Sequence, residues 1–117
     1  MSSRNPLDRA DLLVQAPPPT SPDSIVIALS GDIDRENCSE MVLAVTDTLH
    51  RHPGRDVSLD MSEVTFLDSS GIRALLICRR TAMELGTQLK ISKAHRHVQQ
   101  VLSITNLLGV FHLPPDL

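Results

Sequence analysis

The stretch TFLDSSGIRALL (65–76) places an acidic residue, two serines and a glycine where an apolar run changes into an amphipathic one. Oxygen atoms at such a position commonly cap the first turn of a helix, because they accept hydrogen bonds from free backbone N–H groups. A serine there could also act as a nucleophile, or carry a hydroxyl whose charge is changed by phosphorylation. The function of the chain depends on which of these roles Ser69 and Ser70 have.

Catalysis and metal binding are both disfavoured by the surrounding residues. A hydrolase serine usually lies in a G-x-S-x-G turn next to a positioned base, whereas FLDSSGI (66–72) lacks the first glycine and no histidine can be assigned to it. The pairs His50-x-His52 and His95-x-His97 point apart on a helix and have no further ligand to complete a metal site. Phosphate-binding glycine loops are absent from the sequence. We therefore expect no enzyme activity, no catalytic residues, no metal and no cofactor.

A serine that serves as a substrate is the remaining hypothesis. A phosphoryl group on Ser69 would lie at the N-terminus of a helix, where the macrodipole and free N–H groups favour an anion. It would also add about two negative charges beside Asp68. The helix would tolerate this group while the surface around it changed. Such a combination is typical of a switch that alters binding and leaves the fold intact.

The composition predicts one small cytoplasmic domain. The 117 residues suffice for a single core, which must be aliphatic because the chain has two Phe and neither Trp nor Tyr. A net charge of -3 with interspersed charges, and the lack of aromatic stacking platforms, argue against nucleic acid as a partner. No apolar stretch reaches the roughly 18 residues of a membrane span, and the first ten residues lack a signal-peptide core.

Hydrophobic periodicity predicts alternating strands and helices. Strands are expected at four β-branched or alternating segments, 11–16, 24–31 (ended by Gly31), 56–66 and 87–94. Helices are expected at 35–50, with Asp34 as N-cap, at 69–85, ended by Gly86, and at 95–105. The segment 106–113 turns at Gly109 and could add a short edge strand. Residues 1–10 are expected to form a flexible tail and residues 11–117 a single domain.

This element order predicts an α/β fold with a mixed sheet and helices packed on it. The strands 11–16 and 24–31 would pair as an antiparallel hairpin. Right-handed crossovers would make the strands 24–31, 56–66 and 87–94 parallel to one another. Parallel strands end at the same edge of a sheet. GDID (31–34) and DSSG (68–71) should therefore lie close together, at the edge where α/β folds usually bind their ligands.

The helix at 69–85 carries two apolar stripes. One suffices to pack on the sheet and consists of Gly71, Leu75, Cys78, Ala82 and Leu85. The other consists of Ile72, Leu76 and Met83, bordered by Arg73, Arg79 and Arg80. Either the third helix or the C-terminal segment covers this second stripe, or it is a docking face with a basic border. Ser69 falls on the side of the second stripe and Ser70 on the other. Cys38 and Cys78 fall on core-facing positions, where a redox role is disfavoured.

Three segments, SGDID (30–34), LDMSEVTFLDSSGIRALL (59–76) and TNLLGVFHL (105–113), resemble the STAS domain family, specifically its bacterial anti-sigma factor antagonists. The resemblance covers about residues 10–114, and the D-S-S-G motif after an apolar strand is its most specific part. It implies a STAS-like mixed sheet with the order β-β-α-β-α-β-α.

The resemblance also implies a partner-switching role in transcription. In this family the unphosphorylated antagonist binds an anti-sigma factor, typically a serine kinase, and so releases a sigma factor. The kinase phosphorylates the first serine of the motif, here Ser69, and a serine phosphatase reverses the modification. The glycine of the motif would allow a close approach of the kinase backbone, and the chain would be a monomer or weak dimer. The residues expected to bind the partner are Asp32, Asp34, Asp68, Ser69, Ser70, Gly71, Ile72, Arg73 and Leu76.

A second hypothesis is a STAS scaffold or accessory subunit of a stressosome-like or transport complex, in which the serine is only a cap. The fold alone does not distinguish the two hypotheses. The presence of both Ser69 and the flanking Asp68 favours the phosphorylation switch.

Overall fold

Four strands form one mixed sheet in the order β1-β2-β3-β4. The computed structural model describes residues 11–15 and 24–113, so the expected tail at 1–10 lies outside the described part of the chain. β1 (Leu13–Gln15) pairs antiparallel with β2 (Ser24–Ile33). β3 (Asp56–Leu67) and β4 (Leu89–Ala94) follow in parallel. The predicted hairpin, the three parallel strands and the α/β class are therefore confirmed.

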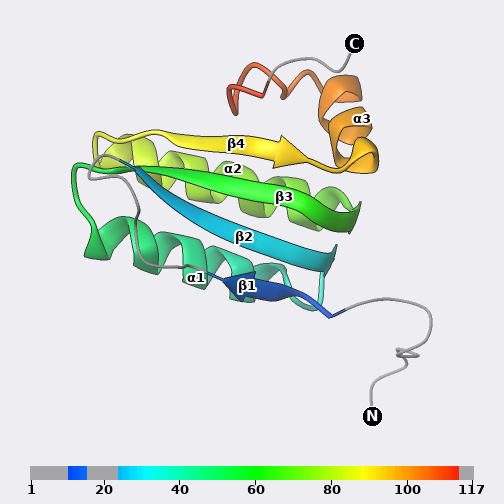
Figure 1. Ribbon diagram of the computed structural model, residues 1–117, viewed down its shortest axis with the longest axis horizontal. Helices are drawn as coiled ribbons and strands as arrows, with labels where there is room; N and C mark the ends of the chain where they lie inside the picture. The colour runs from blue at the N-terminus through cyan, green and yellow to red at the C-terminus, as the bar shows by residue number, and fades with distance from the viewer. Residues whose placement is uncertain (1–10, 16–23, 114–117) are drawn as a thin grey trace.

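Two helices, α1 (Cys38–Arg51) and α2 (Ser69–Glu84), pack against each other on one face of this sheet (Figure 1). Side chains alternate between the two faces of a strand, and the aliphatic residues of β2 and β3 lie on the helix side. The buried residues of these two strands include Ile25, Ile27, Leu29, Val57, Leu59 and Met61. The core is therefore aliphatic, as the composition predicts, and Phe111 is its buried aromatic residue.

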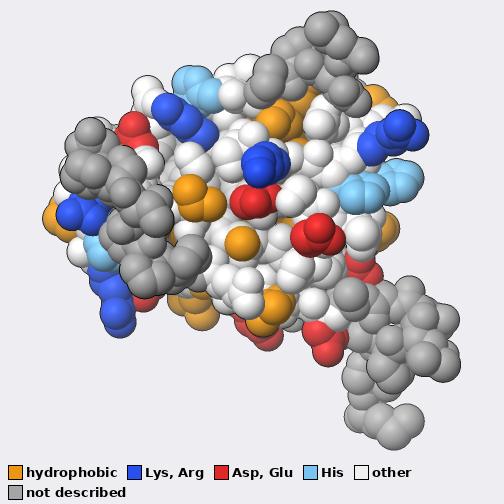
Figure 2. Space-filling view, viewed as in Figure 1, with side chains coloured by type: hydrophobic (Ala, Val, Ile, Leu, Met, Phe, Trp, Pro, Cys, Tyr) orange, Lys and Arg blue, Asp and Glu red, His pale blue; other side chains and the backbone are white. Residues whose placement is uncertain are grey.

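The opposite face of the sheet is turned toward the viewer in Figure 1, and none of the helices in the described ranges lies over its centre. Acidic, basic and apolar side chains are interspersed on this face rather than gathered in one patch (Figure 2). Asp60 pairs in register with Lys93 of β4 and accepts hydrogen bonds from the Ser62 hydroxyl, at 2.7 Å, and the Ser62 N–H, at 3.0 Å. Partial burial disfavours the charge of Asp60, but these bonds and the nearby Lys93 outweigh it and lower the pKa of Asp60.

β3 is longer than β4, and helix α3 (Arg96–Ile104) takes the place of a strand beside its last residues (Figure 1). The final register pair is Met61 with Ala94, after which the chain turns into α3. The segment that follows α3 is not the edge strand that the sequence could form. Its backbone turns through left-handed conformations at Asn106 (φ 61°) and His112 (φ 57°). It still closes the edge of β4, because the Ile91 N–H donates to the Phe111 carbonyl at 3.0 Å.

Two predicted boundaries are wrong. Gly31 does not end β2, which continues to Ile33 through a register shift after this glycine. The first helix begins at Cys38 rather than at residue 35, and its N-cap residue is Asn37 instead of Asp34. The predicted end of the second helix is confirmed, because Gly86 has φ 74° and directly follows the C-cap residue of α2.

Replacement of Phe111 by alanine tests how far the C-terminal segment belongs to the core. Phe111 is fully buried, so Phe111→Ala should lower the free energy of unfolding by about 3–5 kcal/mol. Ile104→Ala is the control, because Ile104 is 74% exposed, and it should change stability by less than about 0.5 kcal/mol. Equal losses in urea denaturation would show that the segment does not pack as described.

Candidate functional site

The first turn of α2 is capped by Asp68 and not by the serines that follow it. One carboxylate oxygen, Oδ1, accepts a hydrogen bond from the Gly71 N–H at 3.0 Å, and the Asp68 backbone is extended as an N-cap residue requires. The Ser69 side chain is exposed, whereas Ser70 is half-buried and faces α1. The two serines therefore point to different sides, and neither hydroxyl is needed to begin the helix.

The acidic loop after β2 is held by its own hydrogen bonds. Asp34 Oδ1 accepts from the backbone N–H groups of Glu36, at 2.9 Å, and Asn37, at 3.3 Å, so Asp34 caps a turn that precedes α1. The Asn37 side chain accepts from the Asp34 N–H at 2.9 Å and donates to the Asp32 carbonyl at 2.7 Å. Because Asp32, Asp34 and Asn37 are all buried, these bonds fix the loop in one conformation.

This loop and the start of α2 meet at one edge of the sheet, as the topology predicts. Ile33 lies opposite Leu67 in the register of β2 and β3, and the Asp68 N–H donates to the Ile33 carbonyl at 3.3 Å. The Thr65 hydroxyl donates to Asp32 Oδ1 at 2.9 Å. Segments that are far apart in the sequence thus meet at the edge of the sheet where α2 begins with Ser69.

Sequence reasoning missed two residues at this edge, Thr65 and Phe66. Thr65 contacts Asp32 directly, and Phe66, opposite Asp32 in the register, leaves 50% of its surface exposed. The sequence signal was two breaks in the alternation of polar and apolar residues, at the polar pair Ser62-Glu63 and at the apolar pair Phe66-Leu67. Such a break marks strand residues that leave the regular pleat and become available to a partner.

Gly71 is required by the packing of the chain itself. It is buried in the first turn of α2, where an added Cβ atom would collide with Leu67 Cδ1 and lie 3.0 Å from Ile33 Cγ2. The absence of a side chain lets the helix approach the ends of β2 and β3 closely. The resemblance assigned this glycine to contact with a partner, but its position is explained by contacts inside the domain.

Most of the first apolar stripe of α2 is buried against the sheet. Gly71, Leu75, Cys78 and Ala82 are buried, as predicted, and Leu85 is 37% exposed. Burial raises the pKa of the Cys78 thiol to about 12, so this thiol stays protonated at neutral pH.

The second stripe is partly open. Ile72 is half-buried against the core, whereas Leu76 and Met83 are 38% and 59% exposed. Of the described residues after α3, Val110 lines a cavity of about 170 Å³ together with Met83, at the far end of this stripe. Leu76, close to Ser69 along the helix, therefore remains available on the surface.

A larger groove runs between α1 and α2 on the other side of α2. It has a volume of about 540 Å³ and is lined by Cys38, Ser39, Val42, Leu43, Ser70, Arg73, Ala74 and Ile77. Leu43 is 69% exposed and Ile77 is 44% exposed. The groove is thus mostly apolar, and Arg73 is the basic residue of its lining.

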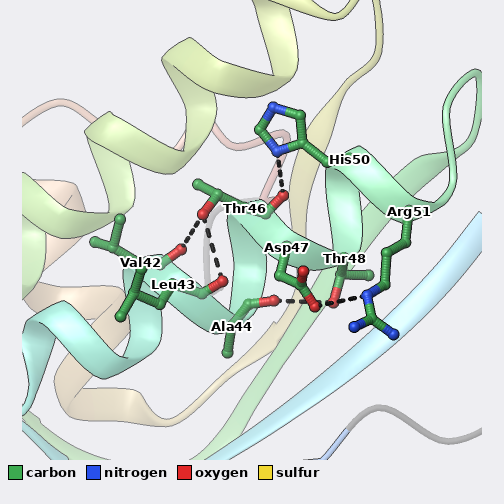
Figure 3. Close-up of polar contacts among 8 residues, drawn as sticks. All are labelled: Val42, Leu43, Ala44, Thr46, Asp47, Thr48, His50 and Arg51. Carbon is green, nitrogen blue, oxygen red and sulfur yellow. Dashed lines mark hydrogen bonds and ion pairs between the residues drawn. The ribbon is translucent and has the colours of Figure 1, made fainter.

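The histidines considered as metal ligands make other contacts. On α1, His50 Nδ1 donates to the Thr46 carbonyl at 2.8 Å (Figure 3). Before α3, His95 Nδ1 accepts from the His97 N–H at 3.1 Å and the two rings stack. Within residues 11–15 and 24–113, no group of three or more His, Cys, Asp or Glu is arranged to hold a metal ion. The helices in these same ranges are too short or too polar to cross a membrane.

Known proteins share this architecture. Residues 18–114 match the family model described as Mlab, STAS domain. An anti-sigma factor antagonist from Mycobacterium paratuberculosis is similar at 22% identity with a TM-score of 0.74, over 92% of this chain and 88% of that chain. The anti-sigma factor antagonist SpoIIAA in its unphosphorylated form is similar at 17% identity with a TM-score of 0.69, over 85% of this chain and 84% of that chain. The Bacillus cell fate determinant SpoIIAA in the phosphorylated form is similar at 16% identity with a TM-score of 0.64, over 85% of this chain and 87% of that chain. These likenesses establish a common fold.

Replacement of Gly71 by alanine tests the close approach of α2 to the sheet. The new methyl group must displace Leu67 and Ile33, so Gly71→Ala should destabilise the domain by about 1–3 kcal/mol. Gly109→Ala is the matched control, since an added Cβ there meets no atom within 4 Å, and its stability should be unchanged or slightly higher. Thermal melts of both variants make the comparison. A Gly71→Ala protein as stable as the wild type would contradict the packing described.

Proposed function

Because the chain belongs to the STAS domain family, we propose that it is an anti-sigma factor antagonist, which binds an anti-sigma factor of the serine kinase type while Ser69 is unphosphorylated. The binding releases a sigma factor, and phosphorylation of Ser69 ends it. The observation that carries this proposal is the exposed Ser69 hydroxyl directly after Asp68, which already caps the helix. Ser69 can be modified without loss of the bonds that hold α2.

The modification needs only the chemistry of a kinase with Mg-ATP. The Ser69 oxygen attacks the γ-phosphorus of ATP, the new O–P bond replaces the bond to the β-phosphate oxygen, ADP leaves, and the hydroxyl proton passes to a base of the kinase. A serine phosphatase would restore the hydroxyl by hydrolysis. The antagonist itself supplies no catalytic group, so it acts as a binding module.

Electrostatics explains how one phosphate would end binding. The group adds about two negative charges at an edge that already holds Asp32, Asp34 and Asp68. Around it lie Ile72 and Leu76, which suit a contact that excludes water. A doubly charged group would lose its hydration in such a contact without a partner charge, which is costly. The fold would stay the same, and this expectation is supported by the similar structures of unphosphorylated and phosphorylated SpoIIAA.

Two Ser69 variants test the switch. Ser69→Asp should melt near the wild-type temperature but bind the serine-kinase anti-sigma factor of the same organism at least tenfold more weakly, about 1.4 kcal/mol. Ser69→Ala should bind this kinase and resist inactivation by it in the presence of Mg-ATP. Isothermal titration calorimetry measures the binding, and mass spectrometry of the wild-type protein should place the phosphate on Ser69.

Ser70→Ala is the matched control, because Ser70 lies one position further and faces the groove. This variant should still be phosphorylated and switched. A phosphate found on Ser70 or Thr65, with Ser69→Ala still inactivated, would contradict the assignment. A stable complex whose affinity is unchanged by Ser69→Asp, Ser69→Ala and Ser70→Ala would instead favour the second hypothesis, a scaffold or accessory subunit.

A further inference from the structure

One cation accompanies Ser69 on the exposed surface of α2. Arg73 follows Ser69 by four positions and is the one charged residue in SSGIRALL, residues 69–76. Its side chain is exposed. The ion pairs between described residues of the two helices, Arg51–Asp47 and Arg80–Glu84, do not involve it. Arg73 thus lies one helical turn from the serine with its guanidinium available.

We propose that a phosphate on Ser69 is bound by Arg73 in an ion pair within α2, and that this pair withdraws the Arg73 charge from the partner-binding surface. The inference rests on the proposed function and deepens it. Arg73 is then the residue by which phosphorylation of Ser69 changes the charge of the partner-binding surface.

Helix geometry brings the two groups together. Residues four apart are neighbours on a helix, with Cβ atoms about 5–6 Å from each other, and an anion placed four residues before a cation is the favourable orientation. Helical side chains lean toward the N-terminus, so that of Arg73 leans toward Ser69. A guanidinium can bind two phosphate oxygens at once through a pair of charge-assisted hydrogen bonds.

The other charges near Ser69 strengthen the case. Asp32, Asp34 and Asp68 are acidic and would repel the phosphate. Arg35, which is exposed in the turn before α1, is the competing cation at this edge. It belongs to a different segment, whereas Arg73 is fixed on the same helix as the phosphate. The local countercharge is therefore Arg73.

Formation of this pair has a consequence for the groove between α1 and α2. Arg73 lines that groove beside Ser70, Ala74 and Ile77. When its guanidinium turns toward Ser69, the lining loses its cation. Phosphorylation then changes the partner surface twice, because it adds an anion at the edge and removes the positive charge from the groove.

The test reads the phosphate itself and needs no kinase. Phosphoserine is incorporated at position 69 during translation, and ³¹P NMR follows the second pKa of the phosphate, which is ordinarily about 6. Arg73 favours the dianion, so Arg73→Gln should raise this pKa by about 0.3–0.7 at low ionic strength. Arg73→Lys keeps the charge and should return the pKa most of the way. The difference between wild type and Arg73→Gln should shrink at 1 M salt.

Two further variants act as comparisons. Arg79→Gln removes an arginine of the same helix that lies beyond the reach of Ser69, and it should leave the phosphate pKa unchanged. Arg35→Gln removes the competing cation. An Arg73→Gln phosphate that titrates like the wild type, or an effect of Arg35→Gln larger than that of Arg73→Gln, would overturn the proposal. Because the phosphate is placed during synthesis, failure of the kinase to modify Ser69 would refute the proposed function without altering this result.

Discussion

Parallel pairing of β2 and β3 continues to their last residues, and the site depends on that continuation. Beyond Gly31 the register shifts, yet Asp32 and Ile33 still pair with Phe66 and Leu67. At this point the Asp68 N–H, at the start of α2, donates to the Ile33 carbonyl at the end of β2, and the Thr65 hydroxyl of β3 donates to Asp32 of β2. Without those final pairs the two segments would be separate loops, and Ser69 would not have a fixed surrounding.

The same edge shows a division of roles between neighbouring residues. Asp68 holds the helix, Gly71 lets it approach the sheet, and Ser69 between them is left exposed. Asp68 contributes the acceptor oxygen that caps the helix, and Gly71 contributes the absence of a Cβ atom. A hydroxyl with neither task is free to be chemically changed, which is why the proposal assigns the switch to Ser69.

The sheet, its topology and the meeting of the two motifs were predictable because they follow from aliphatic periodicity and from the handedness of crossovers. The start of α1 was not. Asp34 is a favoured N-cap type, but the N–H groups that it caps belong to the turn before α1. The Asn37 side chain bonds back to residues 32 and 34 and makes no capping bond to α1. The exposure of Leu76 was also beyond the sequence, because it depends on where the segment after α3 lies. That segment was an ambiguous apolar run. Its backbone is left-handed at Asn106 and His112, and a histidine is not a strong sequence signal for this conformation.

The closure of β4 by the segment at 107–113 bears on how other chains can approach this domain. An open strand edge can accept a further strand from another molecule, which is a common route both to peptide recognition and to aggregation. Here the Ile91 N–H is already occupied by the Phe111 carbonyl, and the other edge of the sheet is β1, a strand of only three residues. Strand addition at Ile91 would require this contact to break first, and β1 offers only a short edge to a further strand. Recognition is thereby directed to side chains on the helices and the loop edge, where a single modified residue can control it.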